Sequence, residues 1–298
     1  MWFTAIAAVA YLLWSGVAVA DDGWGSTAVT SITEFGKEVA FGKSVALTDS
    51  YAIVGSGSPT NKAWIFARNT LGNEEWNSVP TCTIDGYTDN ANFGFDVDLT
   101  DNYAVVGAYK KGWVFIFSRD GTGWGKAAAT TIDGYSSISS FGIDLSITNR
   151  FLAVGSKSNV YIFARDTQGS GQWGNAAVTI LSGETWFGRG VSLTDTYLLV
   201  GSPYPSAQKA YIYARDSVTN TWGTTPVTTI DGYSDQAGFG LGVDMTDSLI
   251  IIGAYKVNKA FIFAARAGGA WNNKAVATLS PSYAGDSVVA YGSSVSIT

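Results

Sequence analysis

The chain has no histidine and only one cysteine, and each deficit excludes a class of chemistry. Without histidine there can be no Ser-His-Asp or Cys-His nucleophile and no histidine-ligated zinc site. The single thiol, Cys82, rules out an intrachain disulfide framework and a thiolate metal cluster. We therefore expect no enzyme that depends on these groups.

Charge is also scarce, at 14% of 298 residues against roughly 25% in an ordinary soluble domain. Lys and Arg number 18 and Asp and Glu 24, which gives a net charge of −6. Such a chain lacks the basic surface that nucleic-acid backbones require, so we do not expect nucleic acid as a partner.

Glycine and aromatic residues are abundant instead, with 35 Gly and 14% Phe, Trp and Tyr. This composition is too apolar for a disordered chain, and it favours strands and turns over helices.

An internal repeat organises the sequence. The dipeptide Phe-Gly recurs at Phe41, Phe93, Phe141, Phe187 and Phe239, and as Tyr-Gly at Tyr291. Tryptophan recurs with nearly the same spacing at residues 24, 76, 124, 173, 222 and 271. Two landmarks with one period near 50 indicate about six repeat units, of which the last is partial.

Each unit predicts four short strands. The first, as in residues 41–47, ends at a Thr-Asp turn, where we expect the Asp carboxylate to bond the backbone two residues on. The second, as in residues 51–55, is apolar and ends in Gly, and the third, as in residues 63–68, ends in Arg. The fourth follows the Trp, as in residues 176–180 and 226–230.

The second and third strands are continuous apolar runs, which is typical of strands covered on both faces. Their connections are too short for helical crossovers, so the strands must be antiparallel. The sequence therefore predicts an all-β protein, a β-propeller of six four-stranded antiparallel blades. A linear β-solenoid is the alternative, and a two-sheet sandwich fits less well because its outer faces would be polar.

The tandem pattern Phe-Gly-x-x-Val-x-Leu-Thr-Asp-x-Tyr-x-x-Val-Gly, followed by an aromatic strand ending in Arg, resembles the FG-GAP repeat. That family includes the β-propeller of integrin α subunits and many secreted or surface proteins of microbes and algae. The resemblance covers residues 41–298 and implies an adhesion-like binding role. The family's Gly-Ala-Pro triplet is approached only at Gly201-Ser202-Pro203, and its Asp-x-Asp-x-Asp-Gly calcium loop is absent. The resemblance therefore implies no metal site.

The two ends of the sequence are expected to build the closing blade together. Residues 291–298 match a first strand, and residues 24–32 match a fourth. Residues 1–20 are uncharged and end in Ala-Val-Ala, like a secretory signal peptide, but they lack its positive start. They could instead be degenerate strands of the closing blade, or an uncleaved membrane anchor. With a signal peptide, that blade lacks two strands and the chain would be a fragment of a longer propeller.

The repeated side chains favour structural roles. A buried Trp removes roughly 150–250 Å² from water, which is reason enough for its recurrence. The arginines at residues 68, 119, 165, 215 and 266 recur once per unit, so we expect them to tie blades together. The carboxylates at residues 96, 98, 144 and 244 could serve histidine-free glycosidase or lyase chemistry, but they also fall at repeat-equivalent positions.

Binding residues are expected where two sets of loops share one face of the ring. These loops precede the first strand of a unit and join its second strand to its third. They carry the candidates Asp85, Tyr87, Tyr109, Lys110, Asp133, Tyr135, Tyr204, Asp231, Tyr233, Tyr255 and Lys256. Loops on a rigid scaffold are common recognition sites, so we expect a ligand at the mouth of the ring.

Calcium is a weak possibility, with Asp85, Asp89, Asp231 and Asp235 as candidate ligands. Solvated acidic turns account for the same residues, and no cofactor is expected. The sequence thus predicts a monomeric, secreted or cell-surface, non-enzymatic module that binds protein or glycan, and membrane contact only through residues 1–20. A carbohydrate-active propeller, as a lectin or a carboxylate-based glycosidase or lyase, is the alternative.

Overall fold

A computed structural model describes residues 40–69, 76–86, 91–133, 135, 137–204, 208–232, 238–266, 268–280 and 291–298. Within these ranges the secondary structure is β-strand except for a 3-10 turn, η1 (Tyr255–Val257), which confirms the all-β prediction. No helix in this part of the chain could span a membrane. The predictions for residues 1–20 and 24–32 lie outside the described residues.

The strands form five sheets in chain order. The first sheet contains β1 (Ser44–Leu47), β2 (Tyr51–Gly55), β3 (Lys62–Ala67) and β4 (Cys82–Asp85). The second contains β5 (Phe93–Leu99), β6 (Tyr103–Ala108), β7 (Trp113–Asp120), β9 (Thr130–Ile132) and the short β8 (Gly123–Trp124). The third contains β10 (Leu145–Ile147), β11 (Phe151–Gly155), β12 (Asn159–Ala164) and β13 (Thr179–Ser182). The fourth contains β14 (Gly190–Leu193), β15 (Tyr197–Ser202), β16 (Lys209–Ala214) and β17 (Thr228–Asp231). The fifth contains β18 (Phe239–Met245), β19 (Leu249–Ala254), β20 (Lys259–Ala264) and β21 (Ala277–Leu279).

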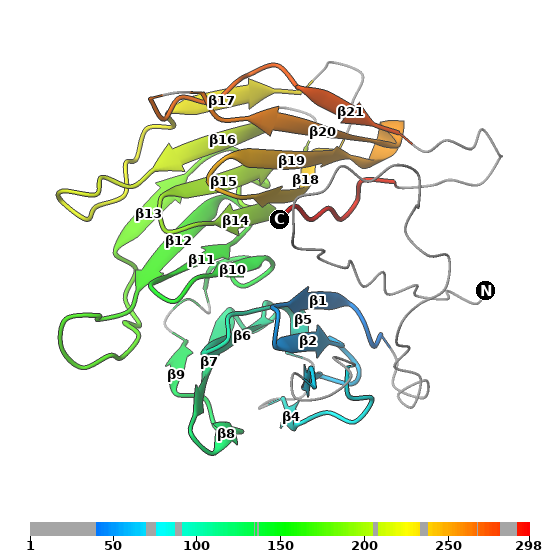
Figure 1. Cartoon of the computed structure of the whole chain (residues 1–298), viewed down its shortest axis with the longest axis vertical. Helices are drawn as coiled ribbons and strands as arrows, with labels where there is room; N and C mark the ends of the chain where they lie inside the picture. Colours follow the sequence, from blue (N-terminus) through cyan, green and yellow to red (C-terminus); the bar gives the residue numbers. More distant parts are fainter. Residues whose placement is uncertain are drawn as a thin grey trace.

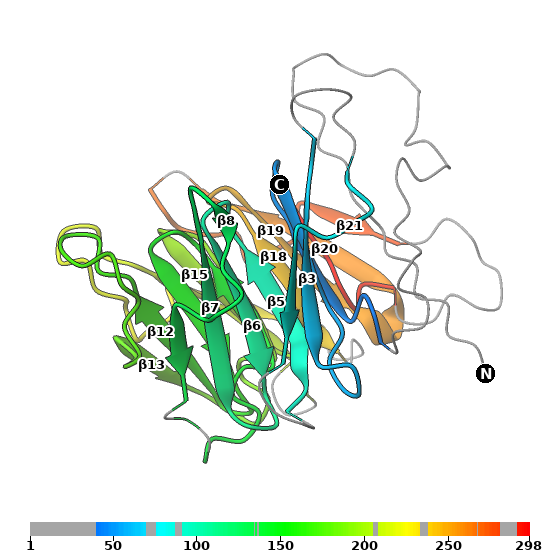
Figure 2. The ribbon, with the colours of Figure 1, turned by 90° about the horizontal axis from the view of Figure 1, so that it is seen from below.

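The sheets follow one another around a common centre in a propeller-like fold (Figure 1). Successive strands within each sheet pair antiparallel, and the first strand of each sheet lies nearest the centre. Seen from below, the strands of neighbouring sheets lie in adjacent layers (Figure 2). The described residues contain five such sheets, whereas the sequence predicts six blades.

The predicted second strands agree with β2 and β11, but the fourth strands begin later than predicted. Residues 176–178 precede β13 because the chain is still turning there. Val178 already donates its N–H to Ile162 O, at 2.7 Å, yet its side chain is 58% exposed. An apolar residue in a strand-like run therefore does not mark a strand here.

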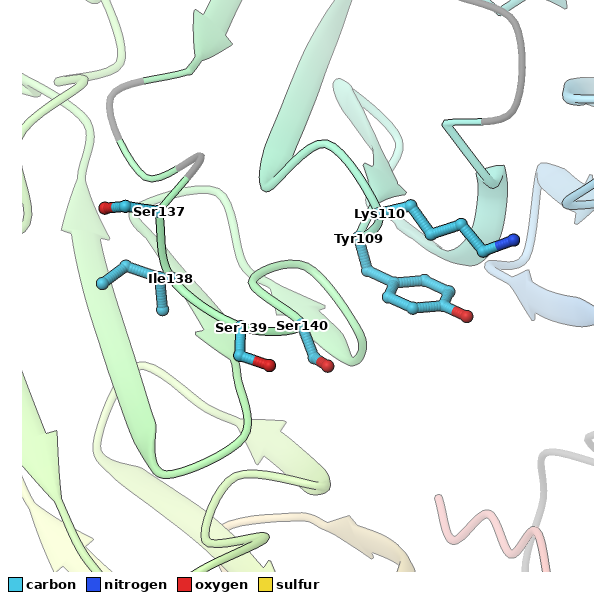
Figure 3. A pocket seen from close by; sticks show the side chains of 6 residues that line it. All are labelled: Tyr109, Lys110, Ser137, Ile138, Ser139 and Ser140. Carbon is cyan, nitrogen blue, oxygen red and sulfur yellow. The ribbon is translucent and has the colours of Figure 1, made fainter.

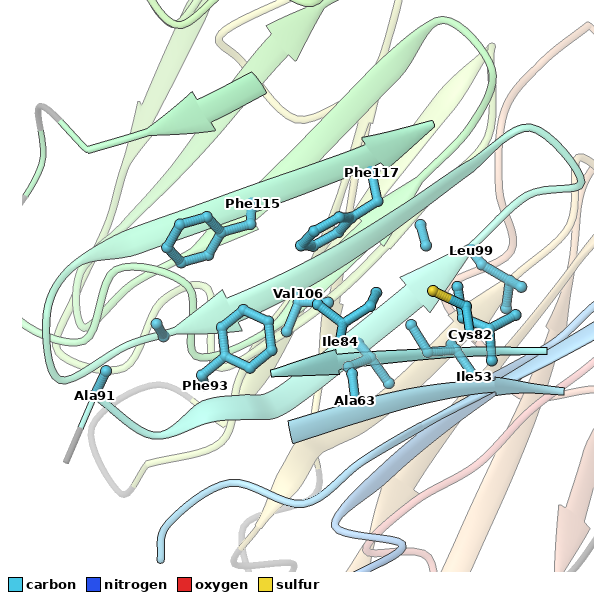
Figure 4. Close-up of a cluster of buried hydrophobic side chains, with 14 residues drawn as sticks. Ile53, Ala63, Cys82, Ile84, Ala91, Phe93, Leu99, Val106, Phe115 and Phe117 are labelled. Carbon is cyan, nitrogen blue, oxygen red and sulfur yellow. The ribbon is translucent and has the colours of Figure 1, made fainter. Parts of the chain in front are cut away.

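The hydrophobic core lies between the sheets. Figure 4 shows one such layer, in which Ile84 and Ala63 of the first sheet face Phe93 and Val106 of the second. Each of these four side chains is at most 1% exposed. Burial within the same layer raises the pKa of the Cys82 thiol. Each sheet therefore needs its neighbours to cover its faces, as in repeat proteins generally.

The recurring Trp and Arg side chains join neighbouring sheets, as the sequence predicts. Trp173 of the third sheet packs edge-to-face on Tyr103 of the second, with ring centroids 5.5 Å apart. Arg165 lies over the same Tyr103 ring, at 5.4 Å, and its Nε donates to Asn149 O. The pattern recurs at Trp124–Tyr51, Trp222–Phe151 and Trp271–Tyr197.

Two glycines of the repeat let backbones of neighbouring sheets touch. A Cβ on Gly155, which ends β11, would overlap the carbonyl oxygen of Gly188 in the next Phe-Gly pair. Gly188 itself has a φ of +91°, a conformation that L residues with side chains rarely adopt. The same contact joins Gly107 to Gly142.

The Thr-Asp turn differs from the prediction, because threonine rather than aspartate holds the hairpin. Thr194 Oγ1 accepts N–H bonds from Thr196 and Tyr197, at 3.1 and 2.9 Å. The same hydroxyl donates to Asp247 of the next sheet, at 2.6 Å. Aspartate at this position therefore links sheets instead of closing its own turn, and Thr48–Asp101 and Thr148–Asp195 repeat the bond.

Residues 291–298 make the contacts of a further first strand without pairing as one. Ile297 N–H donates to Asp244 Oδ2 at 2.8 Å, and a Cβ on Gly253 would overlap Gly292 O. Tyr291 N–H donates to Asn258 Oδ1 at 3.1 Å, as Phe93 N–H does to Asn61 Oδ1. The segment thus continues the arrangement of the five sheets.

Candidate binding site on the rim loops

One face of the molecule carries two sets of connections, which we call the rim loops. They join the last strand of a sheet to the first strand of the next, and the second strand of a sheet to its third. A pocket of about 270 Å³ lies between a loop of each kind, lined by Tyr109, Lys110 and residues 137–140. The β6–β7 and β9–β10 loops thus converge, as the sequence predicts for this face.

The side chains at this pocket are mostly polar. In Figure 3 the hydroxyl groups of Ser139 and Ser140 point toward the side of the Tyr109 ring, while the Lys110 amine points away from the serines. Tyr109 packs on Phe95 of β5, with centroids 4.6 Å apart, and Lys43 Nζ lies 4.7 Å from the Phe95 ring centroid. The pocket is thus lined by one aromatic ring and one cation, and Phe95 supports the ring from behind.

Tyr204 and Trp186 form a second aromatic pair on the same face. Their rings stack at 5.3 Å with an interplanar angle of 25°, and Tyr204 is 50% exposed. Tyr204 is among the residues predicted from the sequence, but Trp186 is not. Trp186 falls outside the 50-residue tryptophan ladder, and that irregularity is the sequence signal that marks it.

The aspartates of the rim pair with lysines on the outer part of the sheets. Asp85, at the end of β4, lies 3.7 Å from Lys62 Nζ, and Asp231, at the end of β17, lies 3.1 Å from Lys209 Nζ. Asp133 is exposed after β9. These carboxylates lie at the ends of the fourth strands of their sheets.

Tyr135, a predicted binding residue, packs against the third sheet. Its ring stacks on Phe141 at 4.5 Å and 6°, and it meets Tyr161 edge-on at 5.0 Å. Its hydroxyl accepts the N–H of Ala177 at 3.1 Å. Because both its ring and its hydroxyl are engaged between sheets, Tyr135 has little left to offer a ligand.

Tyr255 and Lys256 lie in η1, on the β19–β20 loop. The Tyr255 ring packs against the backbone of Gly238, where a Cβ would overlap it, and Lys256 Nζ lies 5.9 Å from that ring. Tyr255 is half-buried and Lys256 is exposed. This loop therefore offers a cation more readily than an aromatic face.

The remaining predicted site residues, Tyr87, Asp89, Tyr233 and Asp235, lie outside the described residues. Asp85 and Asp231, the other calcium candidates, pair with lysine amines. No group of three or more metal-binding side chains occurs in the part of the chain that the structure describes.

Four carboxylates near the centre of the ring, Asp96, Asp98, Asp144 and Asp244, connect the first strands of neighbouring sheets. We call them the inner carboxylates. Each accepts a backbone N–H from the next first strand: Leu145 to Asp96, Ile147 to Asp98, Val191 to Asp144 and Ile297 to Asp244, at 2.6–2.8 Å. They satisfy donors that an edge strand would otherwise leave unpaired.

Burial raises the pKa of three of these carboxyl groups, Asp96, Asp98 and Asp144. It raises the pKa of Asp98 to about 7 and the pKa of Asp96 to about 6. Burial also raises the pKa of Asp144, and the negative charge of Asp96 raises it further, whereas the Arg189 guanidinium opposes this. Asp98 can therefore hold a proton near neutral pH.

No protein-family model and no curated protein matches the chain. Solved structures of propeller proteins do. A "putative 6-phosphogluconolactonase" from Bacteroides uniformis is 11% identical with a TM-score of 0.59, over 78% of this chain and 70% of that one. A chain of the Mitotic Checkpoint Complex is 13% identical with a TM-score of 0.54, over 81% and 68%. A protein from Lactobacillus plantarum is 15% identical with a TM-score of 0.53, over 80% and 70%. At such identities the likeness shows the fold alone.

Proposed function

We propose that the protein is a non-enzymatic binding module that recognises protein or glycan with its rim loops. The observation that carries this proposal is the pocket formed by the β6–β7 and β9–β10 loops. These loops differ in sequence from sheet to sheet, whereas the repeated polar side chains are used in bonds between sheets. A rigid scaffold with varied loops on one face is suited to recognition.

The test exchanges one loop for another. Replacing residues 109–112 with the shorter β11–β12 connection, residues 156–158, removes Tyr109 and Lys110 while keeping a connection native to the protein. We expect ligand binding to fall and the melting temperature to stay within a few degrees. The matched control shortens the β7–β8 turn on the opposite face, at residues 121–122, and should leave binding intact. Equal binding by both variants would refute the proposal.

We further propose that the ring has six blades, that the closing blade is shared between the ends of the chain, and that the repeats belong to the FG-GAP type. The contacts of residues 291–298 with the fifth sheet support a sixth position. A crystal structure would count the blades directly.

Export is part of the same proposal, as a secreted or cell-surface monomer. Residues 1–20 have the apolar character of a signal peptide. Sequencing the exported protein from its N-terminus should give a start at Asp21. A retained Met1 would favour the interpretation of these residues as blade strands.

The inner carboxylates support one alternative, a carbohydrate-active enzyme. A carboxyl with a pKa near 7, such as Asp98, could act as a general acid without histidine. Hydrolysis of glycosides and sugar lactones by the protein, abolished by Asp98→Asn or Asp144→Asn, would establish it. Their bonds to Ile147 and Val191 favour the structural role.

A further inference from the structure

The pocket on the rim carries positive charge that the protein's own carboxylates leave free. Two other rim lysines, Lys62 and Lys209, form ion pairs with Asp85 and Asp231. Lys110, by contrast, is exposed in the pocket wall and pairs with no carboxylate among the described residues. No Asp or Glu lines the pocket within the same part of the chain. In a protein of net charge −6, this local excess of positive charge points to an acidic ligand.

Lys157 adds a second amine at the opposite wall. Its backbone N–H donates to Ser139 O, at 3.0 Å, and its carbonyl oxygen accepts the N–H of Trp186. These two bonds hold Lys157 beside the serines of the pocket, while its side chain is exposed. Within the described ranges Lys157 forms no ion pair either. Positively charged residues therefore lie on both sides of the pocket.

The serine hydroxyls of the pocket are also free for a ligand. Serines near the centre of the ring are engaged between sheets, as Ser44 donates to Asp96 and Ser192 to Asp244, at 2.7 and 2.9 Å. The hydroxyls of Ser139 and Ser140 make no hydrogen bond to the described part of the chain. They point toward the side of the Tyr109 ring (Figure 3). The pocket thus combines an aromatic ring, two hydroxyls and two amines.

We infer that this pocket binds an acidic sugar residue, a pyranose that carries a carboxylate or a sulfate group. The inference deepens the proposed function and rests on it. The apolar C–H face of the sugar packs on the Tyr109 ring, because aromatic faces carry partial negative charge. Its hydroxyls both donate and accept hydrogen bonds, as do those of Ser139 and Ser140. Lys157 on the serine side and Lys110 on the tyrosine side attract the acidic group.

The size and surroundings of the pocket favour a sugar over an acidic protein. Its volume of about 270 Å³ is close to the lower end, roughly 300 Å³, of pockets that hold small ligands. A stable protein interface instead buries roughly 800 Å² per partner around an apolar centre. Among the described residues, Tyr204 is the single exposed large apolar side chain on a rim loop. The rim therefore offers a small polar pocket rather than an apolar docking surface.

The experiment compares acidic oligosaccharides with their uncharged counterparts. Uronic-acid and sulfated oligosaccharides are titrated calorimetrically into the full chain, each beside its methyl ester or its desulfated form. The counterpart keeps the sugar ring and removes the charge. We expect at least one acidic oligosaccharide to bind, with an affinity at least tenfold above that of its counterpart and falling as salt is added. The uronate and sulfate series show which acidic group the pocket prefers.

Three variants locate the charge effect. Lys110→Gln and Lys157→Gln should each weaken binding about fivefold, and the double variant at least tenfold, as expected for exposed ion pairs. Lys274→Gln is the matched control, because it removes the same charge from an exposed lysine on the β20–β21 connection, on the opposite face. It should leave the affinity unchanged. All three side chains are exposed, so the melting temperatures should stay at the wild-type value.

The outcomes separate this inference from the proposed function. Equal binding of acidic and uncharged oligosaccharides, or equal weakening by Lys274→Gln, refutes the acidic-sugar site. So does equally tight binding of a poly-glutamate peptide, which would show attraction by charge alone. In each case a protein or neutral glycan ligand that is lost on exchange of residues 109–112 would still uphold the rim loops. Acidic-glycan binding unchanged by both pocket variants and by the loop exchange refutes both.

Discussion

The boundaries between sheets and the rim loops follow opposite rules. At each boundary between described sheets equivalent side chains recur with equivalent contacts: Trp on an aromatic ring, Thr to Asp (or to Asn149 between the second and third sheets), and Gly on Gly. On the rim, the residue before Phe-Gly changes from Ala to Asn, Ser, Trp and Gly although the backbone conformation stays the same. Repetition therefore marks what holds the ring together, and departure from repetition marks where a ligand can be distinguished.

The largest expected loss of stability comes from a side chain inserted where the backbones of two neighbouring sheets touch. In Gly155→Ala the new Cβ would overlap Gly188 O, and neither backbone can move without shifting its sheet. We expect a loss of more than about 4 kcal/mol in unfolding free energy, or failure to fold. Urea denaturation measures this. Gly121→Ala is the control, because nothing lies within 4 Å of its Cβ, and it should change stability by less than about 0.5 kcal/mol.

Two tryptophans sharpen the contrast between boundary and rim. Trp173 is 6% exposed and packs on Tyr103. Trp173→Ala should therefore lower the free energy of unfolding by about 3–5 kcal/mol. The free energy of unfolding of Trp186→Gly should stay within about 1 kcal/mol of the wild-type value. Relief of the backbone strain at the positive φ offsets the greater flexibility that glycine gives the unfolded chain. Chemical denaturation of both variants gives the comparison, and similar losses would show that Trp186 is a packing residue.

Asp98 makes the boundary between the second and third sheets sensitive to pH. Asp98 has a folded pKa of about 7, above its unfolded value of about 3.9. The folded protein therefore binds more protons between these values, and stability falls as the pH rises from about 4 to about 7. We expect the protein to be more stable at pH 5 than at pH 8 by on the order of 2–4 kcal/mol. Urea midpoints test this, and Asp98→Asn should flatten the profile; an unchanged slope would place the effect elsewhere.

The smallest expected change in stability comes from a single hydrogen bond between sheets, which two Thr→Val variants isolate. Thr148→Val removes both the turn bonds to residues 150 and 151 and the bond to Asp195. Thr246→Val removes comparable turn bonds, to residues 248 and 249, and within the described residues Thr246 makes no bond to a neighbouring sheet. The difference between their unfolding free energies should be about 1 kcal/mol, near the net worth of a hydrogen bond. Equal losses would mean that the Thr–Asp link contributes nothing.

Much of this arrangement could be predicted from residue order. The 50-residue period predicts the succession of sheets, and the apolar runs predict the second and third strand of each sheet. Recurrence identifies Trp and Arg as links between sheets. The role of Asp in the Thr-Asp turn was wrong, because the prediction considered only partners close in sequence, whereas Asp195 bonds a residue 47 positions away. The sequence likewise did not indicate the bond from Ala177 N–H to the Tyr135 hydroxyl, 42 positions away.

The sequence alone determined the all-β repeat, its antiparallel strands and the exclusion of histidine and thiolate chemistry, because these follow from periodicity and composition. Only the tertiary structure decided which polar groups remain available to a ligand. Asp96, Asp98 and Asp144 become links between strands because the open edges of neighbouring sheets place unpaired N–H groups beside them. Trp186, which the sequence sets apart only by its place outside the tryptophan ladder, meets the ring of Tyr204 because the tertiary structure brings two separate loops together.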